Sequence, residues 1–411
     1  MISRRVFLRN GALTAVGLSM VPGFLERAAM AAPQAGRRKT LVVVFQRGAA
    51  DGLNIVVPFG ERAYYAHRPT IAIPAPGSSD DAALDLDGFF GLHPALGPLH
   101  GLYREGRFAV VNAVGMPDTG GRSHFQAQDF MESATPGNRN VTTGWLNRYL
   151  SSEPDPMESS FRAAALAESM PKALRGPAPA LSVRSLADFS LPGGFLYESL
   201  YSGAGNTLLT GAAREMFDGM RQLEAVRLAD HGPAPGVNYG ANPANPGEFG
   251  SAMMQIAQLI KADVGLQVAF VDVRGGWDTH SDEAARLADL LQTFGRGLAT
   301  FHQDLGDRME DVVVVTMSEF GRTARENGSG GTDHGHANFM FVTGGPVRGG
   351  RVYSGWPGLE PEQLNENRDL ALTVDFRDVL GELLVGHLGC EDTDSIFPGY
   401  GVDSGRFLGI L

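Results

Sequence analysis

The sequence predicts an α/β protein with a mostly parallel central sheet flanked by helices on both faces. Short, β-branched apolar runs recur along the chain, as is typical of strands that are buried on both faces. The segments between several of these runs repeat large apolar residues at spacings of three and four, which is typical of helices. Of the 411 residues, 43% are hydrophobic and 19% are charged. This is an ordinary composition for a globular protein with a sizeable core.

Five apolar runs predict strands, at residues 41–45, 108–114, 268–273, 312–317 and 339–343. Between the third and fourth runs, one helix face is predicted by Leu287, Leu290, Leu291, Phe294, Leu298, Phe301 and Leu305. A similar face precedes the third run, at Met253, Ile256, Ile260 and Val264. Strand, helix and strand therefore alternate, which favours parallel strands joined by helical crossovers.

One α/β domain is expected to span residues 32–411, with an insertion or cap at about residues 140–250. Residues 140–230 have a partly helical pattern and separate the first two predicted strands from the later ones. Residues 232–247 hold four prolines and four glycines, a density that neither a helix nor a sheet tolerates. The sequence contains no internal repeat.

Residues 1–31 have the features of a twin-arginine signal peptide. Arg4 and Arg5 precede an apolar stretch at residues 11–25, and Ala29-Met30-Ala31 fits a signal-peptidase site. A basic N-terminal helix or an uncut anchor is the alternative, but the stretch is short and interrupted for a bilayer of about 30 Å. We therefore expect a periplasmic or secreted protein that engages the twin-arginine translocation machinery and has no stable membrane anchor.

The net charge argues against a nucleic-acid partner, and the single cysteine limits the kinds of metal site. The formal net charge is −12, so the chain is not suited to follow a nucleic-acid backbone. Because Cys390 is the only cysteine, an intrachain disulfide and a thiolate metal cluster are both excluded. Any bound metal must be held by His, Asp and Glu.

Polar, glycine-rich clusters adjoin the predicted strands, at residues 47–52, 118–124, 275–280, 318–322 and 330–336. Ligands bind outside the carboxyl ends of strands in open α/β sheets. The candidate metal ligands are Asp51, Asp278, His280, Asp333, His334 and His336. Such nitrogen and oxygen donors suit zinc, manganese or magnesium. Taken alone, Asp51 is better explained as a turn residue, whereas the Asp333-His334-Gly335-His336 run favours a metal.

Ser123 has two compatible interpretations. Ser123 and Gln126 fit a capping box that opens a helix. A serine at a helix N-terminus also lies where an anion is well received, and a nearby metal would make it a nucleophile. Arg122 and Arg322 could hold an oxyanion, and Glu319 could be a ligand or a base, although charged residues at strand ends are often simply solvated.

Several motifs together resemble the bacterial family that carries domain of unknown function 1501. They are the twin-arginine leader and residues 47–54, 122–125, 276–280, 318–323 and 333–335. The resemblance runs almost to the C-terminus. That family is grouped with the alkaline-phosphatase-like superfamily of phosphatases, sulfatases and phosphoglycerate mutases. The resemblance implies a phosphatase-like α/β/α fold, a Ser or Thr nucleophile at a helix start, and usually two divalent metals held by Asp and His. For this chain we expect one or two ions of zinc, manganese, magnesium or calcium.

Carried over by residue, Asp51 matches the metal-binding Asp after the first strand, and Ser123 is similar to the nucleophile. Asp278 and His280 resemble a later ligand pair, although one residue separates them here instead of three. Either Asp333-His334 or Glu319 takes the role of the superfamily's Asp-His pair, and both alignments remain open. A formylglycine sulfatase is disfavoured, because no Cys/Ser-x-Pro-x-Arg motif is present.

These features together predict an exported metal-dependent hydrolase of phosphate or sulfate esters, small molecules or glycans, with Ser123 as nucleophile. The alternative is a non-catalytic, metal-stabilised binding or assembly protein of the cell envelope. The shortened Asp278–His280 spacing favours that alternative.

Overall fold

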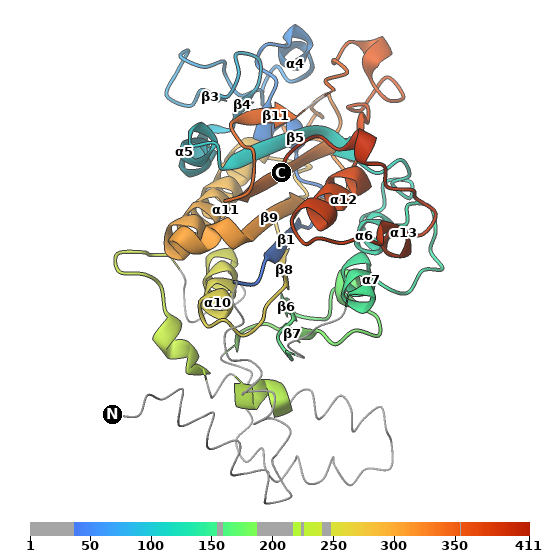
Figure 1. Ribbon diagram of the computed structural model, residues 1–411. Coiled ribbons are helices and arrows are strands. Elements are labelled where there is room, and N and C mark those ends of the chain that lie inside the picture. Colours follow the sequence, from blue (N-terminus) through green and yellow to red (C-terminus); the bar gives the residue numbers. More distant parts are fainter. Residues whose placement is uncertain (1–36, 154–158, 187–216, 223–225, 241–247, 354) are drawn as a thin grey trace, which may run out of the picture.

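The protein is built around one large mixed sheet with helices on both faces (Figure 1). The computed structural model describes residues 37–153, 159–186, 217–222, 226–240, 248–353 and 355–411. The strand order is β11-β5-β10-β9-β1-β8-β6-β7, and β12 pairs with β5. The strands are β1 (Thr40–Gln46), β5 (Phe108–Gly115), β6 (Ala163–Leu166), β7 (Leu181–Val183), β8 (Val268–Val273), β9 (Val312–Met317), β10 (Asn338–Gly344), β11 (Arg351–Tyr353) and β12 (Val374–Asp375). All five strands predicted from the apolar runs are confirmed.

The central strand β1 shows why its sequence is continuously apolar. Val42 and Val44 point into the core on one face of the sheet, whereas Leu41, Val43 and Phe45 point into the core on the other. Successive side chains of a strand point to opposite faces, so a strand covered on both sides needs apolar residues at every position. The prediction of a buried parallel strand is confirmed, because β1 pairs in parallel with both β8 and β9.

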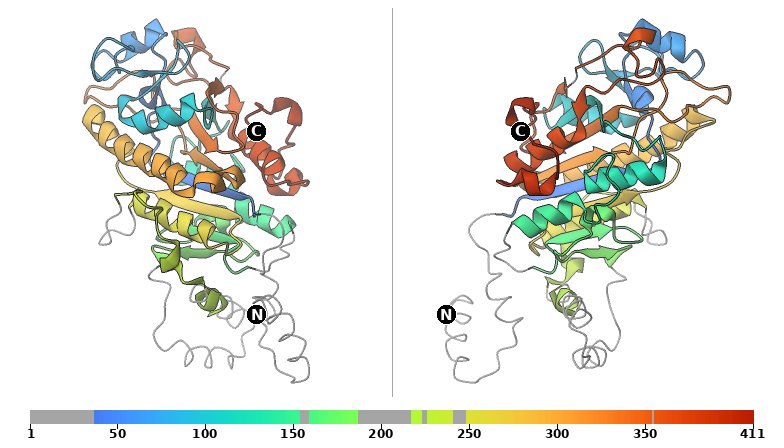
Figure 2. Two further views of the ribbon diagram at one scale, coloured as in Figure 1. Left: turned by 60° about the vertical axis from the view of Figure 1, so that its left-hand side comes forward. Right: turned by 90° about the vertical axis from the view of Figure 1, so that its right-hand side faces the viewer.

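In the part of the chain that the structure describes, helices cover both faces of the sheet (Figure 2). One face carries α5 (Gly97–Arg104), α10 (Phe249–Lys261) and α11 (Glu283–Leu305). The other face carries α6 (His124–Ser133), α7 (Trp145–Ser152) and α12 (Phe376–Gly386). The predicted periodic helices correspond to α10 and α11, so both are confirmed.

Smaller elements complete the described part of the chain. A second, three-stranded sheet has the order β2-β4-β3 and is formed by β2 (Val56–Val57), β3 (Leu84–Asp85) and β4 (Gly91–Leu92). The short helices are α3 (Gly52–Ile55), α4 (Arg62–His67) and α13 (Thr393–Ile396). Turns of 3₁₀ helix lie at Pro94–Leu96, Lys172–Leu174, Leu228–His231, Gly306–Asp311, Pro361–Gln363 and Ser404–Arg406.

The direction of β10 determines which loops meet. β10 runs antiparallel to both β9 and β5, while β1, β8 and β9 are mutually parallel. The start of β10 therefore lies at the same edge of the sheet as the carboxyl ends of the parallel strands. As a result, the loop before β10 faces the loops that follow β1, β8 and β9.

The expected insertion contributes in part to the main sheet. β6 and β7 both come from this region and extend the sheet beyond β8. Residues 187–216, 223–225 and 241–247 of the same region lie outside the described residues, as does the predicted signal peptide at residues 1–31. Among the helices that are described, none has both the length and the apolar character needed to cross a membrane.

Candidate metal centre

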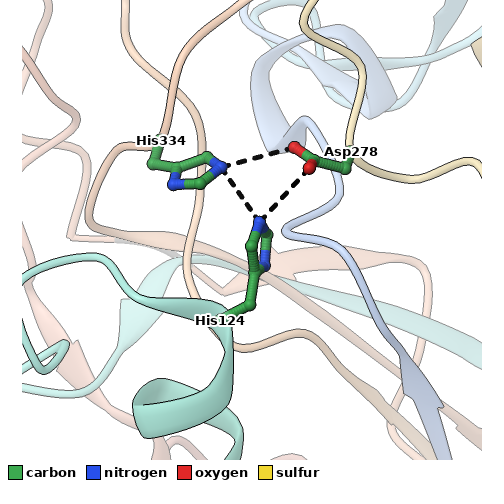
Figure 3. A group of neighbouring side chains, drawn as sticks. All are labelled: His124, Asp278 and His334. Carbon is green, nitrogen blue, oxygen red and sulfur yellow. Dashed lines mark hydrogen bonds and ion pairs between the residues drawn. The ribbon is translucent and has the colours of Figure 1, made fainter.

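Two imidazoles and one carboxylate meet at the carboxyl edge of the sheet (Figure 3). His124 is the first residue of α6, Asp278 lies in the loop after β8, and His334 lies in the loop before β10. The Nε2 atoms of His124 and His334 are 2.9 Å apart. Oδ2 of Asp278 lies 3.5 Å from Nε2 of His124, and Oδ1 of Asp278 lies 3.3 Å from Nε2 of His334. Donor atoms that surround one zinc ion at about 2.1 Å are separated by roughly 3.4 Å, so this spacing suits a single metal.

The hydrogen bonds behind the two imidazoles determine which nitrogen faces the centre. His124 Nδ1 is 2.8 Å from Glu319 Oε1, and His334 Nδ1 is 3.0 Å from the carbonyl oxygen of Arg122. Because both partners are acceptors, each Nδ1 is assigned the proton, which leaves each Nε2 facing the centre. Two Nε2 lone pairs at 2.9 Å would repel each other, so the contact needs either a bound cation or a proton on one Nε2. Without a metal, that proton is favoured on His124, because the hydrogen bond to Glu319 raises the pKa of His124 whereas burial lowers the pKa of His334. Metal-binding histidines are oriented by this kind of outer hydrogen bond.

His280 lies beside the triad. Its Nε2 is 3.0 Å from that of His334 and 3.1 Å from Asp278 Oδ1. Its Nδ1 lies 2.9 Å from Asp333 Oδ1, so this ring too directs a lone pair inward. The group that shares one centre nevertheless consists of His124, Asp278 and His334. His280 therefore occupies the position of an optional fourth ligand.

Arg322 joins the loops that surround the centre. Its side chain is fully buried and donates to Asp278 Oδ1 at 2.6 Å. It also donates to the carbonyl oxygens of Gly48, Ala49, Trp277 and Thr332. Partial burial opposes ionisation of Asp278, but the hydrogen bond and charge of Arg322 outweigh it, and the pKa of Asp278 is lowered. The guanidinium expected to hold an oxyanion thus fixes the loops and one candidate ligand.

Glu319 lies behind His124, on the Nδ1 side of its ring. The carboxylate is buried directly after β9, and its Oε1 also accepts from the Gly48 amide at 2.9 Å and Gln128 Nε2 at 2.8 Å. Burial opposes its ionisation, but the hydrogen bonds from His124 and Gln128 prevail and lower the pKa of Glu319. The carboxylate that the sequence suggested as a ligand or a base therefore orients the ring of His124, a candidate ligand.

Two glycines allow the loop before β10 to approach the segment after β9. The Gly335 amide donates to the carbonyl of Gly321 at 2.7 Å, and the Gly321 amide donates to that of His336 at 2.8 Å. A Cβ at Gly335 would lie 2.3 Å from the carbonyl oxygen of Arg322, and one at Gly321 would lie 1.9 Å from that of Ala337. Only glycine fits at either position, so these two glycines allow the two backbone segments to lie in close contact.

Ser123 precedes α6 as expected, but the predicted capping box is wrong. Its backbone is extended, with φ −86° and ψ 120°, and its half-buried side chain makes no cap hydrogen bond. The preceding Arg122 has a φ of +63°, a conformation that is costly for a residue with a side chain. That conformation accompanies the contact of its carbonyl with His334, while its guanidinium donates to Glu366 at 2.6 Å and Asp369 at 2.8 Å.

Three further predicted ligands make contacts other than with the triad. Asp51 is fully buried and forms a two-point ion pair with Arg68. His336 Nε2 lies 3.1 Å from the carbonyl of Met116. Asp333 is exposed and holds the outer nitrogen of His280.

His124 is a candidate ligand that the sequence analysis does not include among its predicted site residues. Its signal is an imidazole in a glycine-rich cluster after a strand, the same signal that identifies His280 and His334. Glu283, a buried carboxyl group behind the loops, begins α11 outside any such cluster, so nothing in the sequence marks it.

Comparison with known proteins gives one family match. Residues 121–395 match a family model described as "Protein of unknown function (DUF1501)". No curated protein matches the sequence. A solved structure titled "Crystal structure of Ps i-CgsB in complex with k-i-k-neocarrahexaose" is 9% identical, with 89% of this chain and 75% of that chain covered, at a TM-score of 0.36. A likeness of that degree carries no information on function.

Proposed function

The chain belongs to the DUF1501 family, and we propose that it is a metal-dependent hydrolase of phosphate or sulfate esters. The observation that carries this proposal is the convergence of His124, Asp278 and His334 on one point, with the outer nitrogen of each ring occupied by an oxygen acceptor. The donor set is two imidazoles and one carboxylate, which suits zinc or manganese.

Three protein ligands leave a coordination position open, which distinguishes catalytic sites from closed structural ones. A divalent ion held there would act as a Lewis acid and would lower the pKa of a nearby hydroxyl or water. Arg322 would keep Asp278 ionised through its hydrogen bond to Oδ1. Glu319 would hold the His124 ring in the correct orientation through its hydrogen bond to Nδ1. His280, with Asp333 behind it, would complete the coordination when the ester is absent.

Ser123 is the proposed nucleophile. It adjoins His124 in the chain, and its side chain is not engaged as a helix cap. The free amide groups in the first turn of α6 would receive the negatively charged group of the substrate. This combination of hydroxyl, helix start and metal supports transfer of the phosphoryl or sulfuryl group from the ester oxygen to Ser123 Oγ, with loss of the hydroxyl proton and departure of the alcohol. Water would then hydrolyse the Ser123 ester and release phosphate or sulfate.

A metal-stabilised binding protein of the cell envelope is the second candidate. One specific observation favours it: both arginines proposed to hold an oxyanion already have acceptors. Arg122 is paired with Glu366 and Asp369, and Arg322 is surrounded by four carbonyl groups and Asp278.

Metal analysis with an ester panel separates the two candidates. The mature protein, purified from the periplasm, would be analysed for divalent metal and assayed on p-nitrophenyl phosphate and p-nitrophenyl sulfate, before and after chelation. The hydrolase proposal requires bound metal and turnover that is lost on chelation and restored by the metal. Bound metal without turnover on any ester would favour the binding protein, and protein that binds no divalent metal would contradict both.

We also infer export by the twin-arginine route, from Arg4, Arg5 and the Ala29-Met30-Ala31 site. Replacement of Arg4 and Arg5 with lysine should leave precursor in the cytoplasm. Efficient export of that double variant would contradict the inference, and replacement of Arg9 alone serves as the control that should export normally.

A further inference from the structure

One buried carboxyl group joins the two loops that carry the candidate ligands. Glu283 is the first residue of α11 and is fully buried. Its Oε2 accepts hydrogen bonds from Thr279 Oγ1 at 3.1 Å and from Thr332 Oγ1 at 2.7 Å. Its Oε1 accepts from Asn54 Nδ2 at 2.9 Å. A single side chain thus contacts three segments that are far apart in the sequence.

Both threonines adjoin candidate ligands. Thr279 lies between Asp278 and His280, and Thr332 is two residues before His334. The two loops also meet directly, because the Thr332 amide donates to the Thr279 carbonyl at 3.1 Å. Fixing the two hydroxyl groups on one oxygen atom therefore sets the separation of the two loops.

The surroundings of Glu283 are unfavourable for a buried carboxyl group. Asp51 is buried beside it, and Arg68 forms its two-point ion pair with Asp51. Two carboxyl groups are thus buried with one guanidinium, an arrangement that costs stability. Local features that oppose stability are concentrated at functional sites.

We propose that Glu283 is a positioning residue that holds Asp278 and His334 at the separation one metal ion requires. The proposal rests on the metal centre of the proposed function. Leucine has a similar size but no oxygen atom, so Glu283→Leu removes the acceptor that both threonines share, whereas glutamine would keep one such oxygen. Removal of Glu283 should therefore loosen both loops and weaken metal binding, although Glu283 makes no contact with the metal ligands themselves.

Cobalt is a suitable probe, because the intensity of its visible d–d absorption reports coordination number without any assay of turnover. Metal-free mature protein would be titrated with Co²⁺ for the wild type, Glu283→Leu and the double variant Thr279→Val, Thr332→Val. We expect both variants to bind Co²⁺ about 10- to 100-fold more weakly, as is typical when an outer partner is lost, and with a weaker absorption per bound ion. The double variant Thr279→Ser, Thr332→Ser keeps the hydroxyl groups and should bind as the wild type does.

Glu382→Leu is the matched control. Glu382 is also buried, but it accepts from the backbone amides of Leu408, Gly409, Ile410 and Leu411. This variant should lose stability without a change in Co²⁺ affinity or spectrum.

The outcomes separate this inference from the proposed function. Folded Glu283→Leu with wild-type affinity and spectrum would overturn the inference and leave the metal centre intact. Wild-type protein that does not bind Co²⁺ would overturn the metal centre and the inference with it. Should Glu283→Leu fail to fold, the threonine variants decide, since Val replaces Thr with almost no change in volume: unchanged Co²⁺ binding in that pair would overturn the inference.

Discussion

The Nε2 atoms of His124 and His334 lie 2.9 Å apart, and each ring is held from behind by an oxygen acceptor, Glu319 and the carbonyl of Arg122 respectively. The two residues are 210 positions apart in the sequence. Their contact depends on α6 following β5 and on the loop before β10 ending at the same sheet edge. With both outer nitrogens protonated, the pair is stable only when a proton or a metal ion lies between the two lone pairs.

His334→Ala should lower bound metal and thermal stability together. A ligand that binds only the folded state stabilises it by about 2.7 kcal/mol at a concentration of 100 times Kd, and this gain should disappear with the ligand. The measurement is metal content and melting temperature with and without added zinc. His336→Ala is the control on the same loop, because His336 contacts the Met116 carbonyl and should leave metal content unchanged. Equal metal content in wild type and His334→Ala would rule out the proposed centre.

Ser123→Ala should separate the chemistry of the hydroxyl from helix capping. A serine that caps a helix contributes about 1 kcal/mol, but Ser123 makes no cap hydrogen bond. We therefore expect a free energy of unfolding within about 0.5 kcal/mol of wild type, as for an ordinary surface change. Ester hydrolysis should fall at least hundreds-fold, on the scale typical of nucleophile removal. Ser123→Asp should likewise remain folded and inactive, and near-normal turnover in either variant would remove Ser123 from the mechanism.

Gly335→Ala should disrupt the site through the backbone. The added Cβ would lie 2.3 Å from the carbonyl oxygen of Arg322, so the strand-like pairing of the two loops must open. We expect a loss of stability of about 1–3 kcal/mol, as for overpacking elsewhere, together with reduced metal content. Gly328→Ala is the control in the same loop, because its Cβ would meet nothing within 4 Å. Similar effects of the two substitutions, by chemical denaturation and metal analysis, would show that the close approach is not needed.

Glu283 should make the metal-free protein less stable as the pH rises. Burial and the neighbouring charge of Asp51 raise the pKa of Glu283 from 4.5 to about 8. The folded protein therefore holds this proton more tightly than the unfolded chain does. The resulting stability is fully present below about pH 4.5 and is lost as the pH rises through about 8.

Urea unfolding of wild type and Glu283→Gln at about pH 5 and about pH 8, with chelator present, tests this pH dependence. The variant cannot titrate at this position, so its free energy of unfolding should fall less over the interval than that of the wild type. Parallel pH dependence in the two proteins would contradict the raised pKa.

The sequence alone determined the strands, the long helices and the sheet edge at which the candidate site lies. Strand β1 and helix α11 were predictable because an apolar period of two or 3.6 residues is a local property of the chain. The edge was predictable because polar loops at the carboxyl ends of parallel strands gather in one place. Asp278 and His334 were found in this way, since both lie in such loops.

The tertiary structure alone decided which of these side chains face one another. Asp51 follows β1 as predicted, yet Arg68 lies close enough to pair with both of its oxygens. Glu319 was a candidate ligand from the sequence, but in the structure it accepts the hydrogen bond from the outer Nδ1 of His124. His124, which was not among the predicted ligands, faces the centre instead. These outcomes depend on the order and direction of strands that are distant in sequence, above all the antiparallel β10. Local periodicity carries no information on such pairings, because it sets the face on which a residue lies and not the partner that it meets there.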